Sequence, residues 1–278
     1  MALRSEIDNL MGRNAPALTR IIVINIVVFV AANLYLNIAR PFDGTGLLTY
    51  LGLSSSPKYV LRHPWTLFTY MFLHESVMHI LFNMLWLYWM GKLFVEYLGE
   101  KKLVYTYILG GLAGGLLYLI VYGLAMPEYS ILMGASAGIM AVIIAIAVLL
   151  PDYPIFLFLI GEVKLKYVAL GAFLLTSIVD IGSNSGGKIS HIGGAIYGWV
   201  YIWQSRKGND FVNILSSFFK RIFGKGKRPK KAKMTASMGG KSDKQKRIDD
   251  ILDKISRSGY ESLNQEEKDF LFKSSREK

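Results

Sequence analysis

The 278-residue sequence contains no cysteine and few charged residues, and both shortages limit what the protein can be. Without cysteine there is no disulfide framework, and thiol chemistry is excluded both as catalysis and as metal ligation. Charged residues make up only 19% of the chain, whereas hydrophobic residues make up 52% and the mean hydropathy is +0.34. This composition is too apolar for an ordinary soluble domain, and it predicts a polytopic membrane protein.

Six apolar segments have the length and composition of transmembrane helices or come close to it. They are residues 21–38, 77–98, 103–126, 136–150, 167–179 and 189–203. The fourth, at ~1.5 Å per residue, would extend only about 22 Å, which is less than the roughly 30 Å hydrocarbon core. A helix this short must be surrounded by protein. The segments therefore predict an all-α fold with six transmembrane helices.

Glycine and proline are concentrated where the backbone must bend or approach another helix. The connection 39–65 between the first two segments holds several of each, which excludes one continuous helix, so we expect a structured loop there. The third segment carries two overlapping repeats of small residues, which favour close contact with a neighbouring helix. They are Gly110, Gly111, Gly114 and Gly115.

Positive charge is concentrated at the C-terminal end of the chain. From Arg206 onward there are 20 Lys and Arg against 10 Asp and Glu, which gives +10 of the net +12. Directly after a membrane segment, such a stretch marks the cytoplasmic side and anionic lipid more often than nucleic acid, so we expect no nucleic-acid partner. The lysines and arginines before the first and fifth segments, and between the second and third, lie on the same side. Both termini are therefore predicted to be cytoplasmic.

The composition divides the chain into a membrane domain (1–208), a basic interfacial segment with a flexible linker (209–246) and a small helical module (247–278). Within the second region, residues 211–223 have the pattern of an amphipathic interfacial helix, and residues 225–246 lack apolar periodicity. In the module, Ile251 and Ile255 recur at helical spacing, and Asn264 with Glu267 forms a capping box that starts a second helix. The module is too small for a core of its own, so we expect it to dock on the membrane domain, a second copy or another protein.

A single serine lies among small residues at the start of the fourth segment. Residues 133–140 read Met-Gly-Ala-Ser-Ala-Gly-Ile-Met, so the hydroxyl of Ser136 has open space around it, as a nucleophile needs. The first free N–H groups of the helix would lie beside that oxygen and can hold an oxyanion. The alternative interpretation is a seam of small residues for helix packing in a membrane.

The other polar side chains inside the segments agree with the nucleophile interpretation. His79 and Asn83 are four residues apart on one face of the second segment, and His191 lies near the start of the sixth. Segments two, four and six run in the same direction, so His79, Ser136 and His191 lie at similar depth near the outward ends. Polar side chains in a membrane are costly and therefore point to function.

These residues suggest acyl-transfer chemistry. A serine hydroxyl needs a neighbouring base, and the imidazole of His191 is the candidate, although a lone histidine can also be a satisfied interior residue. Gly194 and Gly198 share the face of His191 and would let the sixth helix pack closely on the fourth. His79 and Asn83, together with the backbone N–H of Ser136, are the candidates for stabilising the oxyanion.

The chain resembles the rhomboid intramembrane serine proteases of bacterial type. The matching stretches are His-Glu-Ser-Val-Met-His-Ile-Leu-Phe-Asn-Met at residues 74–84, Gly-Ala-Ser-Ala at 134–137, and His191 followed by Gly194 and Gly198. The resemblance covers residues 1 to about 205. It implies a six-helix fold in a bacterial inner membrane, a Ser136–His191 dyad without an acid, and oxyanion support from His79 and Asn83. It also implies no cofactor, and substrates that are transmembrane proteins cut within or near their span, usually after a small residue.

Three positions depart from the family pattern. Ala137 follows the serine where glycine is common, Thr66 follows Trp65 where arginine is common, and Met140 stands where a bulky aromatic often stacks on the histidine. None of these changes removes a reacting group. The substrate, the oligomeric state and the role of the C-terminal module stay open.

Three other functions compete with proteolysis by a serine dyad. An inactive rhomboid-like protein that binds membrane proteins would usually have lost one of the reacting residues. A zinc protease built on His74, Glu75 and His79 would need the histidines four apart, whereas a spacing of five puts them about 140° apart on a helix. A transporter would be expected to carry buried Asp, Glu or Arg within its spans, and here only Glu96 and Asp180 occur, at span ends.

Overall fold

The computed structural model describes residues 15–39, 46–125, 129–158, 160–177, 185–209 and 243–276. They fall into two compact units, one within residues 1–218 and the other within residues 219–278. The predicted interfacial helix at 211–223 and the predicted linker up to residue 242 lie outside the described residues.

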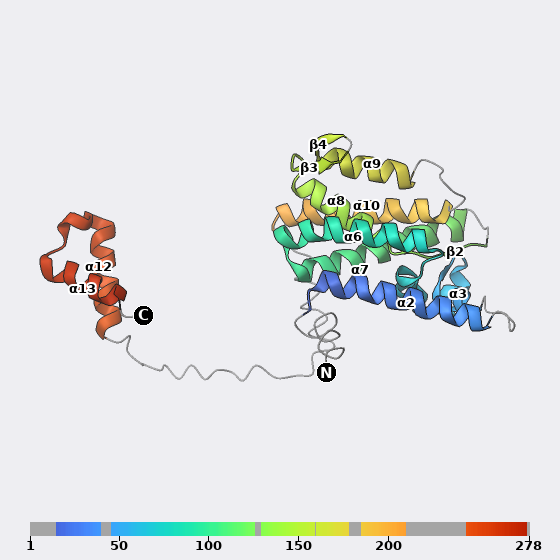
Figure 1. Ribbon diagram of the computed structural model, residues 1–278, viewed down its shortest axis with the longest axis horizontal. Helices are drawn as coiled ribbons and strands as arrows, with labels where there is room; N and C mark the ends of the chain where they lie inside the picture. Colours follow the sequence, from blue (N-terminus) through green and yellow to red (C-terminus); the bar gives the residue numbers. More distant parts are fainter. Residues whose placement is uncertain are drawn as a thin grey trace. The chain divides into compact units, whose positions relative to one another are not determined.

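Six helices of the first unit correspond to the six predicted transmembrane segments. They are α2 (Ala17–Ala39), α6 (Val77–Leu98), α7 (Glu100–Ile120, continued by the π-helical turn η3, Val121–Ala125), α8 (Ser136–Leu149), α9 (Leu165–Ser177) and α10 (Ser185–Arg206). In Figure 1 they lie side by side with their axes roughly aligned. Within the described residues, α2 and the 100–124 helix are each long and apolar enough to cross a membrane, and α8 and α9 are apolar but shorter.

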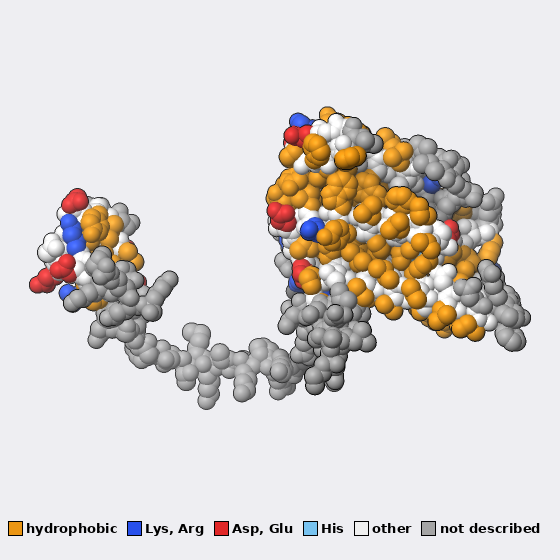
Figure 2. All heavy atoms as spheres, viewed as in Figure 1, with side chains coloured by type: hydrophobic (Ala, Val, Ile, Leu, Met, Phe, Trp, Pro, Cys, Tyr) orange, Lys and Arg blue, Asp and Glu red, His pale blue; other side chains and the backbone are white. Residues whose placement is uncertain are grey.

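Helix α8 is the centre of this unit, as its short length predicted. It packs against α6, α7, α9 and α10, and ten of its fourteen residues are buried. Large apolar side chains are instead exposed on the outer faces of the surrounding helices, and Figure 2 shows them covering most of the visible surface of the unit. The protein is therefore an all-α polytopic membrane protein in which α8 is enclosed by other helices.

Local sequence explains where the long helices begin and end. Ser76 is the N-cap of α6, and its Oγ accepts a hydrogen bond from the N–H of His79 at 3.2 Å. Gly99 ends α6 with φ of +85°, a conformation that glycine adopts without strain, and α7 starts at the next residue. Helices α6 and α7 are therefore joined by one residue.

The glycines on α7 and α10 let both helices approach α8, as the sequence predicted. A Cβ atom at Gly114 would lie 2.6 Å from the Cβ of Ala137, and Cβ atoms at Gly194 and Gly198 would overlap the backbone of Ala137 and Ala141. Real side chains do not reach such distances, so any larger residue at these positions would push the helices apart.

Short elements connect the helices. Between α2 and α6 they are α3 (Gly46–Leu51), β1 (Leu53–Ser54), α4 (Pro57–Arg62), α5 (Thr66–Thr69) and η2 (Tyr70–Phe72). Strand β1 pairs with β2 (Ile131–Leu132), and a hairpin that the sequence analysis did not predict is formed by β3 (Pro154–Leu157) and β4 (Gly161–Lys164). The hairpin buries Ile155, whereas Phe156 and its cross-strand partner Glu162 are exposed. One face of the hairpin is therefore buried and the other is not.

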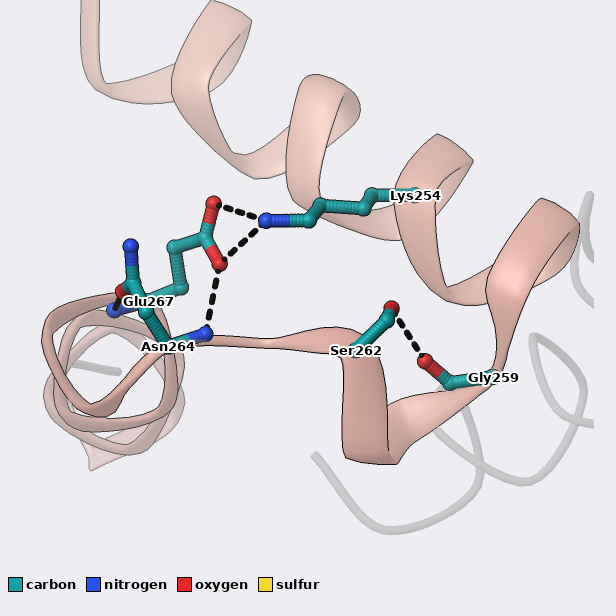
Figure 3. A network of polar contacts seen from close by, with 5 residues as sticks. All are labelled: Lys254, Gly259, Ser262, Asn264 and Glu267. Carbon is teal, nitrogen blue, oxygen red and sulfur yellow. Dashed lines mark hydrogen bonds and ion pairs between the residues drawn. The ribbon is translucent and has the colours of Figure 1, made fainter.

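The second unit contains α12 (Asp243–Ser258), η4 (Tyr260–Ser262) and α13 (Gln265–Arg276). The predicted capping box is confirmed: the N–H of Asn264 donates to Glu267 Oε2 at 2.9 Å, and the N–H of Glu267 donates to Asn264 Oδ1 at 2.8 Å. Figure 3 shows that Lys254 of α12 also donates to both carboxylate oxygens of Glu267. Helix α12 begins four residues before the predicted start of the module at 247.

These contacts predict a pH dependence for the second unit. The Lys254 ammonium, and then the N–H of Asn264, hold the pKa of Glu267 below its usual value. A carboxyl group whose folded pKa is lowered contributes stability that is present above the unfolded pKa, about 4.3, and is lost as the pH falls through the folded pKa. We expect carboxyl-carbon NMR of the full chain to show a titration midpoint of Glu267 below the usual glutamate value.

Lys254→Met should move that midpoint upward, because the largest cause of the shift is removed. A midpoint at or above the usual glutamate value in the unaltered chain would contradict the contacts of Glu267 with Lys254 and Asn264.

Candidate active site

The serine that the sequence singled out is the first residue of α8. Gly134, two residues before it, has φ of +132°, and its N–H donates to the carbonyl oxygen of Tyr70 at 3.0 Å. The N-cap residue Ala135 offers no side-chain acceptor, so the first N–H groups of α8 have no capping partner from that residue. The hydroxyl of Ser136 therefore lies at the positive end of the helix dipole.

His191 of α10 is hydrogen-bonded to Ser136. The distance between His191 Nε2 and Ser136 Oγ is 2.7 Å, and His191 Nδ1 lies 3.1 Å from the carbonyl oxygen of Thr176. A carbonyl oxygen can only accept, so the ring proton is on Nδ1 and Nε2 is left to accept the proton of the serine hydroxyl. The imidazole is therefore held in the tautomer that a general base requires.

Asn83 of α6 is buried, with 8% of its surface exposed, and borders the same space. Its Nδ2 is fully buried and makes no hydrogen bond within the described part of the chain. A cavity of about 40 Å³ separates it from the dyad, bordered by Asn83, Trp86, Ser136, Ile139, Met140, Ile143, Ala172, Thr176 and His191. A buried amide donor without a partner costs roughly 1–3 kcal/mol, and this one borders the same cavity as Ser136.

His79 lies on the same side of Gly134 as Ser136. A Cβ atom at Gly134 would be 3.1 Å from His79 Nε2 and 3.5 Å from Ser136 Oγ. The His79 ring meets the ring of His74 edge to face, with 5.1 Å between centroids. Of the four predicted site residues, Asn83, Ser136 and His191 thus border one cavity, and His79 approaches Ser136 beside Gly134.

Comparison with known proteins identifies the family. Residues 61–207, more than half of the chain, match the model of the rhomboid domain. The chain belongs to the rhomboid family. The rhomboid proteases GlpG of Salmonella newport (strain SL254), Salmonella heidelberg (strain SL476) and Salmonella typhi are each 41% identical over 51 residues. That stretch spans 18% of this chain and 18% of each relative. Residues 240–277 match a family of unknown function (DUF6576).

The departures from the rhomboid pattern have structural explanations. Ala137 is buried against Gly114 of α7 and Gly194 of α10, so its methyl group fits because both neighbours are glycines. Met140 borders the cavity in place of an aromatic ring. Thr66 is buried, and its hydroxyl donates to the carbonyl oxygen of His63 at 2.7 Å. None of the three disturbs the contact between Ser136 and His191.

Sequence reasoning missed two parts of this site. The carbonyl of Thr176 acts through the backbone, so its residue type carries no signal. Its position in the last turn of α9 is a weak signal for this role, because the last four carbonyls of a helix have no intrahelical donor and are free to accept from another group. The conformation of Gly134 was also missed, although a glycine two residues before a candidate nucleophile is a place where positive φ is common.

Gly134→Ala should therefore damage the site more than an ordinary glycine substitution. The positive φ strains any residue that carries a Cβ atom, and the His79 ring would have to shift by a few tenths of an ångström to make room for it. The expected cost in stability is about 1–3 kcal/mol. We expect a lower thermal unfolding midpoint in detergent. The matched control is Gly171→Ala in α9, where a Cβ atom meets nothing within 4 Å and which should be neutral or slightly stabilising. Equal unfolding midpoints for both variants would contradict the assigned conformation.

Proposed function

We propose that this rhomboid is an intramembrane serine endopeptidase that cleaves transmembrane proteins within or near their span, with Ser136 and His191 as a catalytic dyad. The observation that carries the proposal is the 2.7 Å contact between His191 Nε2 and Ser136 Oγ at the start of the enclosed helix α8. The matched relatives are named proteases, which supports the reaction class.

In the proposed reaction, Ser136 Oγ attacks the carbonyl carbon of the scissile peptide and its proton passes to His191 Nε2. The oxyanion of the tetrahedral intermediate accepts hydrogen bonds from Asn83 Nδ2 and the backbone N–H of Ser136, with His79 as a further donor. His191 then gives the proton to the leaving amine. Water activated by the same imidazole hydrolyses the acyl-enzyme and restores the serine.

The carbonyl of Thr176 performs the orienting role that an aspartate has in a triad. It holds the Nδ1 proton and, as part of a helix C-terminus, carries partial negative charge that favours the imidazolium formed during the reaction. This explains how a dyad can work without an acidic third residue.

The cavity beside the dyad limits what can be cut. A volume of about 40 Å³ accommodates water but not a polypeptide segment, so α6, α8 and α9 must separate for a substrate to enter. Trp86 and Met140 narrow the space next to Ser136, which favours a small side chain before the cleaved bond. We propose the bacterial inner membrane as location, with both termini cytoplasmic and the dyad toward the outer face. The proposal needs no cofactor and no nucleic acid.

The alternative is an inactive rhomboid-like protein that binds membrane proteins. The unpaired Asn83 amide argues against it, because a binding protein has no use for a buried donor beside a serine. Among the described residues, no three His, Asp or Glu side chains converge on a point that could hold a metal. The zinc alternative therefore has no support from that part of the chain.

The test is cleavage of a reporter transmembrane segment in proteoliposomes, with product masses measured for the unaltered chain and for Ser136→Ala. Proteolysis by the dyad predicts two complementary fragments that disappear in the variant. An unaltered chain that binds the reporter and leaves it intact would favour the inactive alternative, and fragments that persist in Ser136→Ala would exclude Ser136 as nucleophile.

A further inference from the structure

A second and larger cavity lies away from the dyad, where α2 begins and α6 ends. Its volume is about 450 Å³, and its walls include Leu18, Tyr88, Lys92, Val95, Glu96 and Glu100. This volume is in the range of small-molecule sites, which is roughly 300–1,000 Å³. None of these residues has a role in the proposed proteolysis.

The cavity lies beside a close contact between α2 and α6. Gly91 lets the two helices touch, since a Cβ atom there would lie 2.6 Å from Leu18 Cδ1. Leu18 also borders the cavity, together with Tyr88, Lys92 and Val95 of α6. Tyr88 and Lys92 are exposed, so a ligand in the cavity can reach both side chains.

The position of the cavity corresponds to a membrane–water interface. Tyr88 and Trp89 of α6 are both exposed, and such rings gather at the level of lipid headgroups. In Figure 2, most of the charged side chains seen on the first unit lie at one end of the apolar surface, the end where α2 begins in Figure 1. An amphiphile can therefore place its headgroup among the charged residues and its chains along the apolar helix faces.

The charges in the cavity are of both signs. Lys92 is exposed, with its ammonium 5.2 Å from the centre of the Tyr88 ring, and Glu96 and Glu100 are exposed carboxylates. Within the described part of the chain, these three side chains form no ion pair with one another. One cation beside two carboxylates complements a ligand that itself carries one anion and one cation.

We propose that this cavity binds a zwitterionic phospholipid with a primary ammonium, of the phosphatidylethanolamine type. Lys92 pairs with the phosphate, Glu96 and Glu100 accept hydrogen bonds from the ammonium, and Leu18, Val95 and Tyr88 contact the glycerol and the first methylenes. A choline headgroup has no N–H to donate, and a glycerol headgroup has no cation for the carboxylates. The site therefore distinguishes three common headgroups by their chemistry.

The test is native mass spectrometry of the detergent-solubilised full chain with ethanolamine, choline and glycerol phospholipids of identical acyl chains. We expect the ethanolamine lipid to bind about five- to tenfold more tightly than either of the others. Lys92→Gln should weaken binding of all three lipids. The double variant Glu96→Gln and Glu100→Gln should lose the preference for ethanolamine and bind the glycerol lipid at least as well.

Glu162→Gln, an exposed carboxylate on β4 that does not border the cavity, is the matched control and should keep the original preference. Thermal unfolding of each variant checks that it is folded. Equal binding of the three lipids, or an ethanolamine preference that survives the double glutamate variant, would overturn the proposal. If soluble phosphoethanolamine bound as tightly as the lipid, the claim that the acyl chains contribute to binding would be wrong.

Discussion

Ser136→Ala and His191→Ala are each expected to lower kcat for a transmembrane reporter by at least about 10⁴-fold. The serine supplies the atom that bonds to the substrate, and the imidazole 2.7 Å away takes its proton, so neither group works without the other. The double variant should be no slower than the worse single variant, because groups that act as a unit are not additive. Turnover of a reporter in detergent by all three variants measures this.

Two matched controls separate chemistry from folding. Ser205→Ala changes a serine near the far end of α10, and His63→Gln changes a histidine at the end of α4, and neither residue borders the cavity. Both should keep near-normal turnover. If a correctly folded Ser136→Ala or His191→Ala variant turned over at the rate of these controls, the dyad would be wrong.

Asn83→Leu is expected to lower kcat by about 10- to 10³-fold and, in the same protein, not to lower the unfolding temperature. The first effect follows because a donor to the oxyanion is removed. The second follows because Asn83 Nδ2 is buried without a partner, at a cost of roughly 1–3 kcal/mol that leucine avoids. A loss of activity without a loss of stability at one residue indicates a side chain kept for function.

Asn83→Asp keeps the shape but removes the donor, and it should be at least as slow as the leucine variant. Asn33→Ala in α2 removes an asparagine amide that donates to the carbonyl oxygen of Phe29 and should leave kcat unchanged. Unchanged kcat in both Asn83 variants would mean that backbone N–H groups alone hold the oxyanion.

Much of the site could be predicted because its parts are side chains in continuous helices. His79 and Asn83 are four residues apart, which puts them on one face of a helix. The second, fourth and sixth membrane segments run in the same direction, which predicts that Ser136 and His191 lie at similar depth. The glycines that accompany His191 then predict the close packing of α10 on α8, which the structure confirms. Each of these steps uses either the spacing of residues along a helix or the length of an apolar segment, and both can be read from the sequence.

The remaining features depend on backbone geometry or on contacts between distant segments. The Thr176 carbonyl meets His191 only because α9 ends at that depth. The connection between the fourth and fifth segments was recognised, but the pairing of β3 with β4 within it depends on backbone hydrogen bonds that composition does not show. The same limit applies to Gly134. Only the structure shows that this glycine has positive φ and that the His79 ring and the Ser136 hydroxyl both approach it from one side.

The measurement that tests the central claim most directly is reaction of the full chain with a fluorophosphonate, followed by mass spectrometry of the modified peptide. A serine activated by His191 predicts one adduct, on Ser136, that forms far more slowly in His191→Ala. No adduct on Ser136 in folded protein, or an adduct that forms equally fast without His191, would contradict the catalytic dyad.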